Sequence, residues 1–259
     1  MPDVIVTGLP KSGLTVASAL LDGLPGSICF NSPPSHLQLA SQAADAGTYA
    51  NLLIDDFTRL RGRLLEKHPV SDFRAEDATP LVDELYDPRM PAGETTFSRP
   101  LIDDFILGAK HHTLYTSLLP ALAASAHFKI IAVIRSPMEI FAAWQRLPQP
   151  LVTPLTARFW PEAFSVAHQS DQAACFVQLY DLYLQRYHEL HDQLHIVKYE
   201  DILTDPLIIS RLFGIQTRSS SVPLIQAYRP APPLLTNAEP FRDAIRRYGV
   251  YTKIYYRDH

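Results

Sequence analysis

Five short apolar runs lie along the chain, and each has the length and the residue types of a buried strand. Their sequences are VIVT (4–7), SICF (27–30), FILGAK (105–110), FKIIAVI (128–134) and HIVKY (195–199). The runs are rich in Val, Ile and Phe, which pack well on a pleated surface. The pattern therefore predicts five strands.

Helical patterns lie between several of these runs. In such patterns apolar residues recur every three to four positions, as on one face of a helix. The clearest ones cover residues 15–24, 48–68 and 172–194. Strands that alternate with helices predict an α/β fold with a central parallel β-sheet flanked by helices on both faces. Such sheets bind ligands beyond the carboxyl ends of their strands.

Length and composition fit one domain. The chain has 259 residues, of which 47% are hydrophobic and 19% are charged, as in a soluble protein with a sizeable core. We expect a single domain over residues 1–259, in which the weakly patterned segment 70–104 is a lid or an insertion.

Charge and cysteine content exclude some classes of function. The net charge of −4 gives no general basic field for nucleic acid, so any anion must bind at a local site. The first strand begins too early for a signal peptide, and no apolar run approaches the roughly 20 residues that span a bilayer. We expect a cytoplasmic protein without a membrane span, in which Cys29 and Cys175 are buried reduced thiols.

A glycine turn joins the first strand to the first helix in the stretch VIVTGLPKSGLT (4–15). Backbone N–H groups in such a turn, together with a helix N-terminus, bind phosphate. Gly8, Gly13 and Thr15 fit the nucleoside-triphosphate motif G-x-x-x-x-G-K-[ST], but its lysine position holds Leu14. The lysine is Lys11, inside the loop. The stretch predicts a phosphate-binding loop with a displaced lysine.

An arginine follows the fourth apolar run directly. FKIIAVI continues into RSP, so Arg135 lies at the carboxyl end of a predicted strand, where a guanidinium can bind a second phosphate. The alternative is a surface arginine that caps a turn. A kinase or NTPase would normally have an acidic residue at such a strand end to hold magnesium.

Three stretches together resemble the PAPS-dependent sulfotransferase family. GLPKSGLT (8–15) resembles the family's 5′-phosphosulfate loop, VIRSPMEIFAAW (133–144) its 3′-phosphate motif, and VKYEDILTDP (197–206) its Tyr-Glu-Asp segment. The resemblance implies a P-loop-like three-layer fold. It also implies sulfuryl transfer from 3′-phosphoadenosine 5′-phosphosulfate (PAPS) to a hydroxyl or an amine, with PAP as the product and no metal.

The resemblance implies roles for particular residues. Lys11 would reach the oxygen between sulfur and phosphorus, where negative charge grows as that bond breaks. Arg135 would bind the 3′-phosphate, and Tyr199 would either lie against the adenine or be a core tyrosine. The full set of implied cofactor-binding residues is Pro10, Lys11, Ser12, Gly13, Leu14, Thr15, Arg135, Ser136 and Tyr199.

The sequence departs from the family pattern at several positions. Leu14 replaces a threonine, and Ala143 replaces the serine that usually contacts the 3′-phosphate, a loss for which Ser136 could compensate. The C-terminal glycine-rich lysine motif is absent. The extension 207–259 is a candidate to close over the nucleotide. Its cations are either substitutes for the missing motif or a charged helix face; these are Arg242, Arg246, Arg247 and Lys253.

A candidate general base follows the third apolar run. GAKHHTLYTSLLP (108–120) resembles the family's Lys-x-His segment, which implies that His112 is the base and Lys110 a transition-state partner. A shift of one residue would make His111 the base. Glu94 and Glu76 are carboxylate alternatives.

Two other functions stay open from the sequence. One is an ATP-dependent small-molecule kinase, and the other is a catalytically degenerate relative that binds a nucleotide or a partner protein. For the sulfotransferase, we expect a small-molecule or carbohydrate acceptor and no nucleic acid.

Overall fold

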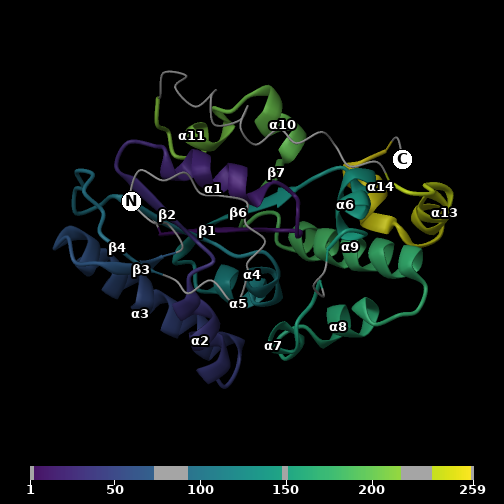
Figure 1. Cartoon of the computed structure of the whole chain (residues 1–259), viewed down its shortest axis with the longest axis horizontal. Helices are drawn as coiled ribbons and strands as arrows, with labels where there is room; N and C mark the ends of the chain where they lie inside the picture. The colour runs from purple at the N-terminus through teal and green to yellow at the C-terminus, as the bar shows by residue number, and fades with distance from the viewer. Residues whose placement is uncertain (1–2, 73–92, 148–150, 217–234, 258–259) are drawn as a thin grey trace.

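A five-stranded parallel sheet forms the centre of the protein (Figure 1). The computed structural model describes residues 3–72, 93–147, 151–216 and 235–257. The strands lie in the order β2-β5-β1-β6-β7, which leaves β1 in the middle. Their bounds are β1 (Asp3–Gly8), β2 (Ser27–Asn31), β5 (Ile106–Lys110), β6 (Phe128–Ile134) and β7 (His195–Lys198). All five predicted strands are confirmed.

Helices cover both faces of the sheet, as predicted for the α/β class. Val4 and Val6 of β1 face a core formed with α1 (Leu14–Asp22), α10 (Tyr199–Thr204) and α11 (Ile208–Leu212). Ile5 points the opposite way, because successive side chains of a strand alternate between the faces. The second core contains residues of α2 (Pro34–Gln42), α3 (Ala46–Leu65), α4 (Thr113–Ser117), α5 (Leu119–Ala124), α6 (Pro137–Trp144), α8 (Pro161–Ala167) and α9 (Gln172–Glu189). The result is a three-layer fold (Figure 1).

The two longest helices begin at aspartate caps. Asp45 accepts a hydrogen bond from the Thr48 N–H at 2.7 Å at the start of α3. Asp171 does the same for α9, where it accepts from the N–H groups of Ala173 and Ala174. Such caps satisfy N–H groups that have no partner inside the helix. Both helices were predicted from apolar periodicity, and both place their apolar faces in the core.

Part of the segment 70–104 forms a short antiparallel pair, β3 (Val70–Asp72) with β4 (Gly93–Thr95). Arg99 joins the segment to the edge of the sheet, because it donates to the carbonyls of Asp22 and Ser27 at 2.9 and 3.0 Å. Residues 73–92 lie outside the described residues. Whether the segment is a lid or an insertion therefore stays a prediction.

The last two described helices, α13 (Glu239–Tyr248) and α14 (Val250–Tyr255), pack against α9. Asp181 of α9 accepts hydrogen bonds from the Thr252 N–H at 2.7 Å and from its hydroxyl at 2.9 Å. Beyond α14, Tyr256 donates to Glu200 at 3.2 Å, which brings the C-terminal segment to the carboxyl end of β7.

The four cations of α13 and α14 are exposed. Arg242 pairs with Glu239 and Arg246 pairs with Asp243, each one turn back on the same helix. Lys253 donates to the carbonyl of Arg246 at 2.8 Å, and Arg247 lies over the ring of Tyr248. These contacts describe a charged helix face. Whether this extension closes over a nucleotide stays a prediction.

One smaller expectation is also met. Cys29 and Cys175 are buried free thiols. Among the described helices, none is both long enough and apolar enough to cross a membrane.

Candidate active site

The candidate site lies where the carboxyl ends of β1 and β6 are adjacent. The chain leaves β1 through α1 on one face of the sheet and leaves β6 through α6 on the other face. Neighbouring strands whose connections leave on opposite faces open a crevice at their carboxyl ends. The predicted phosphate loop and Arg135 both lie at this crevice.

The loop after β1 has the backbone shape of an anion nest. Lys11 and Gly13 are both left-handed, with φ of 69° and 94°. Left-handed residues in such a turn direct neighbouring N–H groups toward one point, which suits an anion. Position 13 must be glycine, because a Cβ atom there would overlap the ring of Tyr199. The ring thus fixes the path of the loop.

The start of α1 adds N–H donors to the nest. The first turn of a helix has N–H groups without intrahelical partners, and these carry partial positive charge. Leu14 begins this helix, and its side chain is buried in the core that faces α1. The missing hydroxyl at this position therefore costs a side-chain contact but leaves the backbone donor in place.

The loop is anchored from α6. The indole Nε1 of Trp144 donates to the carbonyl of Pro10 at 2.8 Å, in a buried contact. Ser12 is fully buried, and its hydroxyl has no hydrogen-bond partner among the described residues. An orphaned hydroxyl within an anion nest fits a ligand whose oxygen atoms accept its proton. The residues present are therefore compatible with a phosphosulfate group.

A second lysine reaches the loop from β5. Lys110 is buried at the carboxyl end of the strand, and its Nζ donates to the Thr15 hydroxyl at 2.9 Å. Thr15 belongs to the first turn of α1. The structure thus brings the predicted partner of the base to the predicted phosphate loop.

Arg135 lies beside the same loop, but an acid on its own helix holds its guanidinium. Its Nε and Nη2 lie 2.6 and 2.5 Å from a Glu139 oxygen, and its Nη1 lies 3.4 Å from the Lys11 carbonyl. The guanidinium stacks 4.7 Å above the Tyr199 ring. Arg135 is only 12% exposed, whereas Glu139 is 36% exposed. A 3′-phosphate would have to compete with Glu139.

The turn after β6 is fixed by groups from distant elements. Tyr180 of α9 donates to the Arg135 carbonyl at 2.6 Å, and Glu200 accepts from the Ser136 N–H at 2.7 Å. Tyr199 contacts both Gly13 and Arg135, so it joins the loop to the arginine. The contact of Tyr199 with an adenine stays a prediction.

Sequence reasoning missed four of these groups, namely Trp144, Glu139, Tyr180 and Glu200. Glu139 could have been found, because residues four apart on a helix are neighbours and often pair as ions. Tyr180 could not have been found, because it comes from a helix far along the chain.

The two histidines after β5 have different surroundings. His111 is buried, and its Nδ1 accepts from the Leu114 N–H at 3.4 Å. Burial, followed by the charges of His112 and Lys110, holds the pKa of His111 well below its usual range. His112 is half-buried, and its Nδ1 lies 2.9 Å from the Thr113 hydroxyl.

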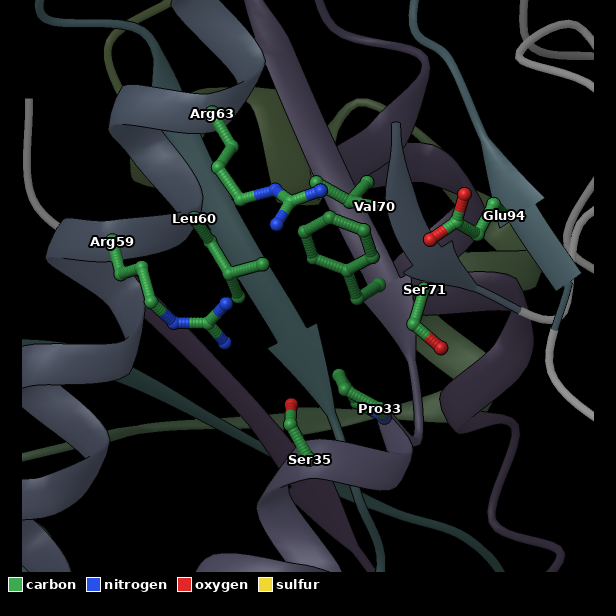
Figure 2. Close-up of a pocket in the computed structure, with 9 residues that line it drawn as sticks. Pro33, Ser35, Arg59, Leu60, Arg63, Val70, Ser71 and Glu94 are labelled. Carbon is green, nitrogen blue, oxygen red and sulfur yellow. The ribbon is translucent and has the colours of Figure 1, made fainter. Parts of the chain in front are cut away.

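The carboxylate alternatives lie elsewhere or outside the described residues. Glu94 and Ser71 line a pocket of about 140 Å³ from the β3–β4 side, while Arg59, Leu60 and Arg63 line it from α3 (Figure 2). Within the described ranges, no hydrogen bond or ion pair joins Glu94 to Lys11, Lys110 or His112. Glu76 falls in the segment that is not described. In the same described ranges, no three His, Cys, Asp or Glu side chains form a metal-binding group.

The fold and the loop define an α/β protein with an anion-binding site at the carboxyl ends of its strands. The family model described as the Sulfotransferase family matches residues 2–211. The chain therefore belongs to the sulfotransferase family. The activity of this family is PAPS-dependent sulfuryl transfer. The predictions of family, fold class and enzyme class are confirmed.

Comparison with solved structures gives distant matches. A sulfotransferase domain from the curacin biosynthetic pathway is 15% identical, with coverage of 93% of this chain and 82% of that chain and a TM-score of 0.46. A sulfotransferase from Mycobacterium avium is 14% identical, with coverage of 96% and 76% and a TM-score of 0.46. A mouse sulfotransferase complexed with PAP is 14% identical, with coverage of 100% and 85% and a TM-score of 0.43. No curated protein matches the sequence.

Proposed function

We propose that this chain transfers the sulfuryl group of PAPS to a hydroxyl group of a small-molecule or carbohydrate acceptor, with Lys11 and His112 as the catalytic residues. One observation carries the proposal. Lys110 from the end of β5 contacts Thr15, and Arg135 from the end of β6 contacts the Lys11 carbonyl, so cations from the two strands beside β1 reach the loop that follows it.

The cations suit a reaction in which charge develops on a leaving phosphate. PAPS supplies an activated sulfuryl group whose departure leaves negative charge on the bridging oxygen. Lys11 would stabilise that charge, since donors fixed in advance lower a barrier most. Lys110, held by Thr15, adds positive charge at the same loop. The first-turn N–H groups would hold the 5′-phosphate.

Arg135 is the residue that would distinguish PAP from AMP, because only PAP carries a 3′-phosphate. A guanidinium offers two parallel donors to such a group. Ser136 lies next to it, at the start of α6, and would add its hydroxyl where the family serine is replaced by Ala143.

The hydrogen bonds of the two histidines favour His112 over His111 as the base. When Nδ1 of a neutral imidazole accepts a hydrogen bond, its proton is on Nε2. His111 accepts from the Leu114 N–H in this way, so it has no second lone pair for a substrate proton. Nδ1 of His112 instead lies 2.9 Å from the Thr113 hydroxyl, which can accept a proton from it and so leave the lone pair on Nε2.

Titration calorimetry with PAP, AMP and ATP tests the proposal. We expect PAP to bind without magnesium and more tightly than AMP, because both the loop and Arg135 contribute. Lys11→Ala should weaken PAP binding, and Lys67→Ala is its control. Lys67 is an exposed lysine that also has a left-handed backbone, with φ of 56°, so its removal should leave PAP binding unchanged. A preference for ATP with magnesium would support the kinase instead. Absence of binding to any of the three would support a degenerate relative.

A further inference from the structure

The hydroxyl of Thr113 contacts three polar groups at once. Thr113 is the first residue of α4 and is only 2% exposed. Its Oγ1 lies 3.1 Å from the Leu151 carbonyl, 2.9 Å from the Tyr183 hydroxyl and 2.9 Å from Nδ1 of His112. These contacts determine which atoms carry protons.

A hydroxyl has one proton and two lone pairs. The Leu151 carbonyl can only accept, so the Thr113 proton points to it. The Tyr183 hydroxyl donates to Thr113 and uses one lone pair. Burial raises the pKa of Tyr183, so this donor keeps its proton at ordinary pH. The remaining lone pair of Thr113 faces His112, whose Nδ1 must therefore donate.

We infer that Thr113, oriented by Tyr183 and the Leu151 carbonyl, fixes neutral His112 in the tautomer with its proton on Nδ1 and its lone pair on Nε2. Thr113 is then a positioning residue, because it acts through the histidine. Only the Nε2 lone pair can take the proton of an acceptor hydroxyl. The catalytic meaning of this inference rests on the proposed role of His112, whereas the tautomer itself does not.

The neighbouring histidine has the opposite arrangement. His111 accepts at Nδ1 from the Leu114 N–H, which places its proton on Nε2. The two rings lie only 5.1 Å apart between centroids, yet their Nδ1 atoms contact different kinds of partner, a backbone N–H and a hydroxyl. Two adjacent histidines in opposite tautomers form an internal control.

Nitrogen-15 NMR of the intact protein measures the tautomers directly. Above the pH at which His112 loses its proton, we expect its spectrum to show the Nδ1–H form. Comparison with His112→Asn identifies the signal. The His111 signals should show the Nε2–H form throughout. An Nε2–H form for His112 in the unmodified protein overturns the inference without any variant.

Two substitutions at Thr113 sharpen the test. Thr113→Val keeps the shape and removes the oxygen, so the Nδ1–H preference should disappear and turnover should fall about 3- to 10-fold, as expected for one lost hydrogen bond. Thr113→Ser keeps the oxygen, so it should keep the tautomer and recover most of that turnover. PAP affinity should change in neither. An unchanged tautomer in Thr113→Val would contradict the inference, and circular dichroism reports whether that variant is folded.

The inference and the proposed function fail in different ways. If His112→Asn keeps its turnover, His112 is not the base, and the role of Thr113 in catalysis is overturned. If the Nδ1–H tautomer is absent, the hydrogen-bond assignment is wrong even when His112→Asn is inactive.

Discussion

The turns after β1 and β6 differ from the turn after β5 in the kind of side chain that holds them. At β1 and β6 the charged groups Arg135, Glu139 and Glu200 act together with two neutral donors, Trp144 and Tyr180. At β5 the groups are mostly neutral hydroxyls. The Thr7 hydroxyl donates to the carbonyl region of His111 and His112, at 3.1 and 3.0 Å. It also lies 2.8 Å from the Thr116 hydroxyl, which in turn lies 2.8 Å from the Tyr187 hydroxyl.

The difference matches the two proposed tasks of phosphate binding and proton transfer. A bound phosphate needs positive charge to compensate its own. A base needs a defined proton position, which hydroxyl networks supply because each hydroxyl has one proton to place. Lys110 lies between the regions, since it belongs to β5 and donates to the loop after β1.

The largest expected effect on turnover is at the turn after β5, which we call the neutral turn; the turns after β1 and β6 are the charged turns. His112→Asn removes the proposed base and should lower turnover by about 10²- to 10⁴-fold. The wild-type rate should rise with pH as His112 loses its proton, and this dependence should be absent in the variant. Steady-state kinetics across pH 5–9 measure both. His111→Asn is the matched control; if the two variants exchange their effects, His111 is the base.

Lys11→Ala tests the proposed role of the lysine in the loop after β1. One lost donor to the bridging oxygen should raise the barrier by about 2.7–4 kcal/mol, with a smaller effect on PAP affinity because the charge develops in the transition state. Single-turnover kinetics and PAP titration separate the two effects. Lys67→Ala controls for the left-handed backbone and should leave turnover unchanged. Near-normal turnover in Lys11→Ala would remove the lysine from the mechanism.

Arg135→Ala should weaken the binding of PAP by about 1.5–3 kcal/mol, the range for a hydrogen bond to a charged group. The binding of AMP should be weakened less, because AMP lacks the 3′-phosphate. Calorimetry with both ligands gives the difference. Arg158→Ala is the control, since this arginine is bonded to the distant Ala44 carbonyl at 2.9 Å. Equal weakening of PAP and AMP would place the 3′-phosphate elsewhere.

Acid should lower the free energy of unfolding, because two buried histidines, His111 and His36, are held neutral in the folded protein. Burial lowers the pKa of both His111 and His36 below 6.5. Each group therefore binds its proton more readily in the unfolded chain, so the stability it gives is complete above pH 6.5 and falls as pH falls. The loss is at most about 1.4 kcal/mol per group per pH unit, and it continues only until the pH reaches the pKa of that group in the folded protein. Urea unfolding at pH 7.5, 6.0 and 5.0 measures it. A free energy of unfolding that stays constant over this range would contradict the burial of both rings.

The smallest expected effect is the change in PAP affinity when Glu139, the ion-pair partner of Arg135, is neutralised. Glu139→Gln keeps the side-chain shape but removes the charge that holds Arg135, so PAP should bind about 2- to 5-fold more tightly, as expected for a partly exposed ion pair. AMP affinity should not change. Glu189→Gln is a control on α9. Weaker binding of PAP by Glu139→Gln would mean that Glu139 orients Arg135 for the phosphate rather than competing with it.

The sequence predicts the sheet and the loop well, because continuous apolar runs and glycine spacing are local signals. It also places Lys110 and His112 at one strand end. It cannot distinguish His111 from His112, since that difference depends on Thr113 being reached by Tyr183 from α9. The anchors Trp144, Tyr180 and Tyr256 escape prediction for the same reason, because tertiary packing brings them from distant positions. The nucleotide-binding roles of Ser136 and Tyr199 stay predictions.

The left-handed backbone at Lys11 has a consequence for how this loop can change. A residue with a Cβ atom costs roughly 1–2 kcal/mol in that conformation, whereas glycine adopts it freely. If Lys11 has the proposed catalytic role, stability and activity favour different residues at position 11. Selection for heat resistance alone would then favour Lys11→Gly, and the proteins so obtained would fold correctly but transfer sulfuryl groups far more slowly.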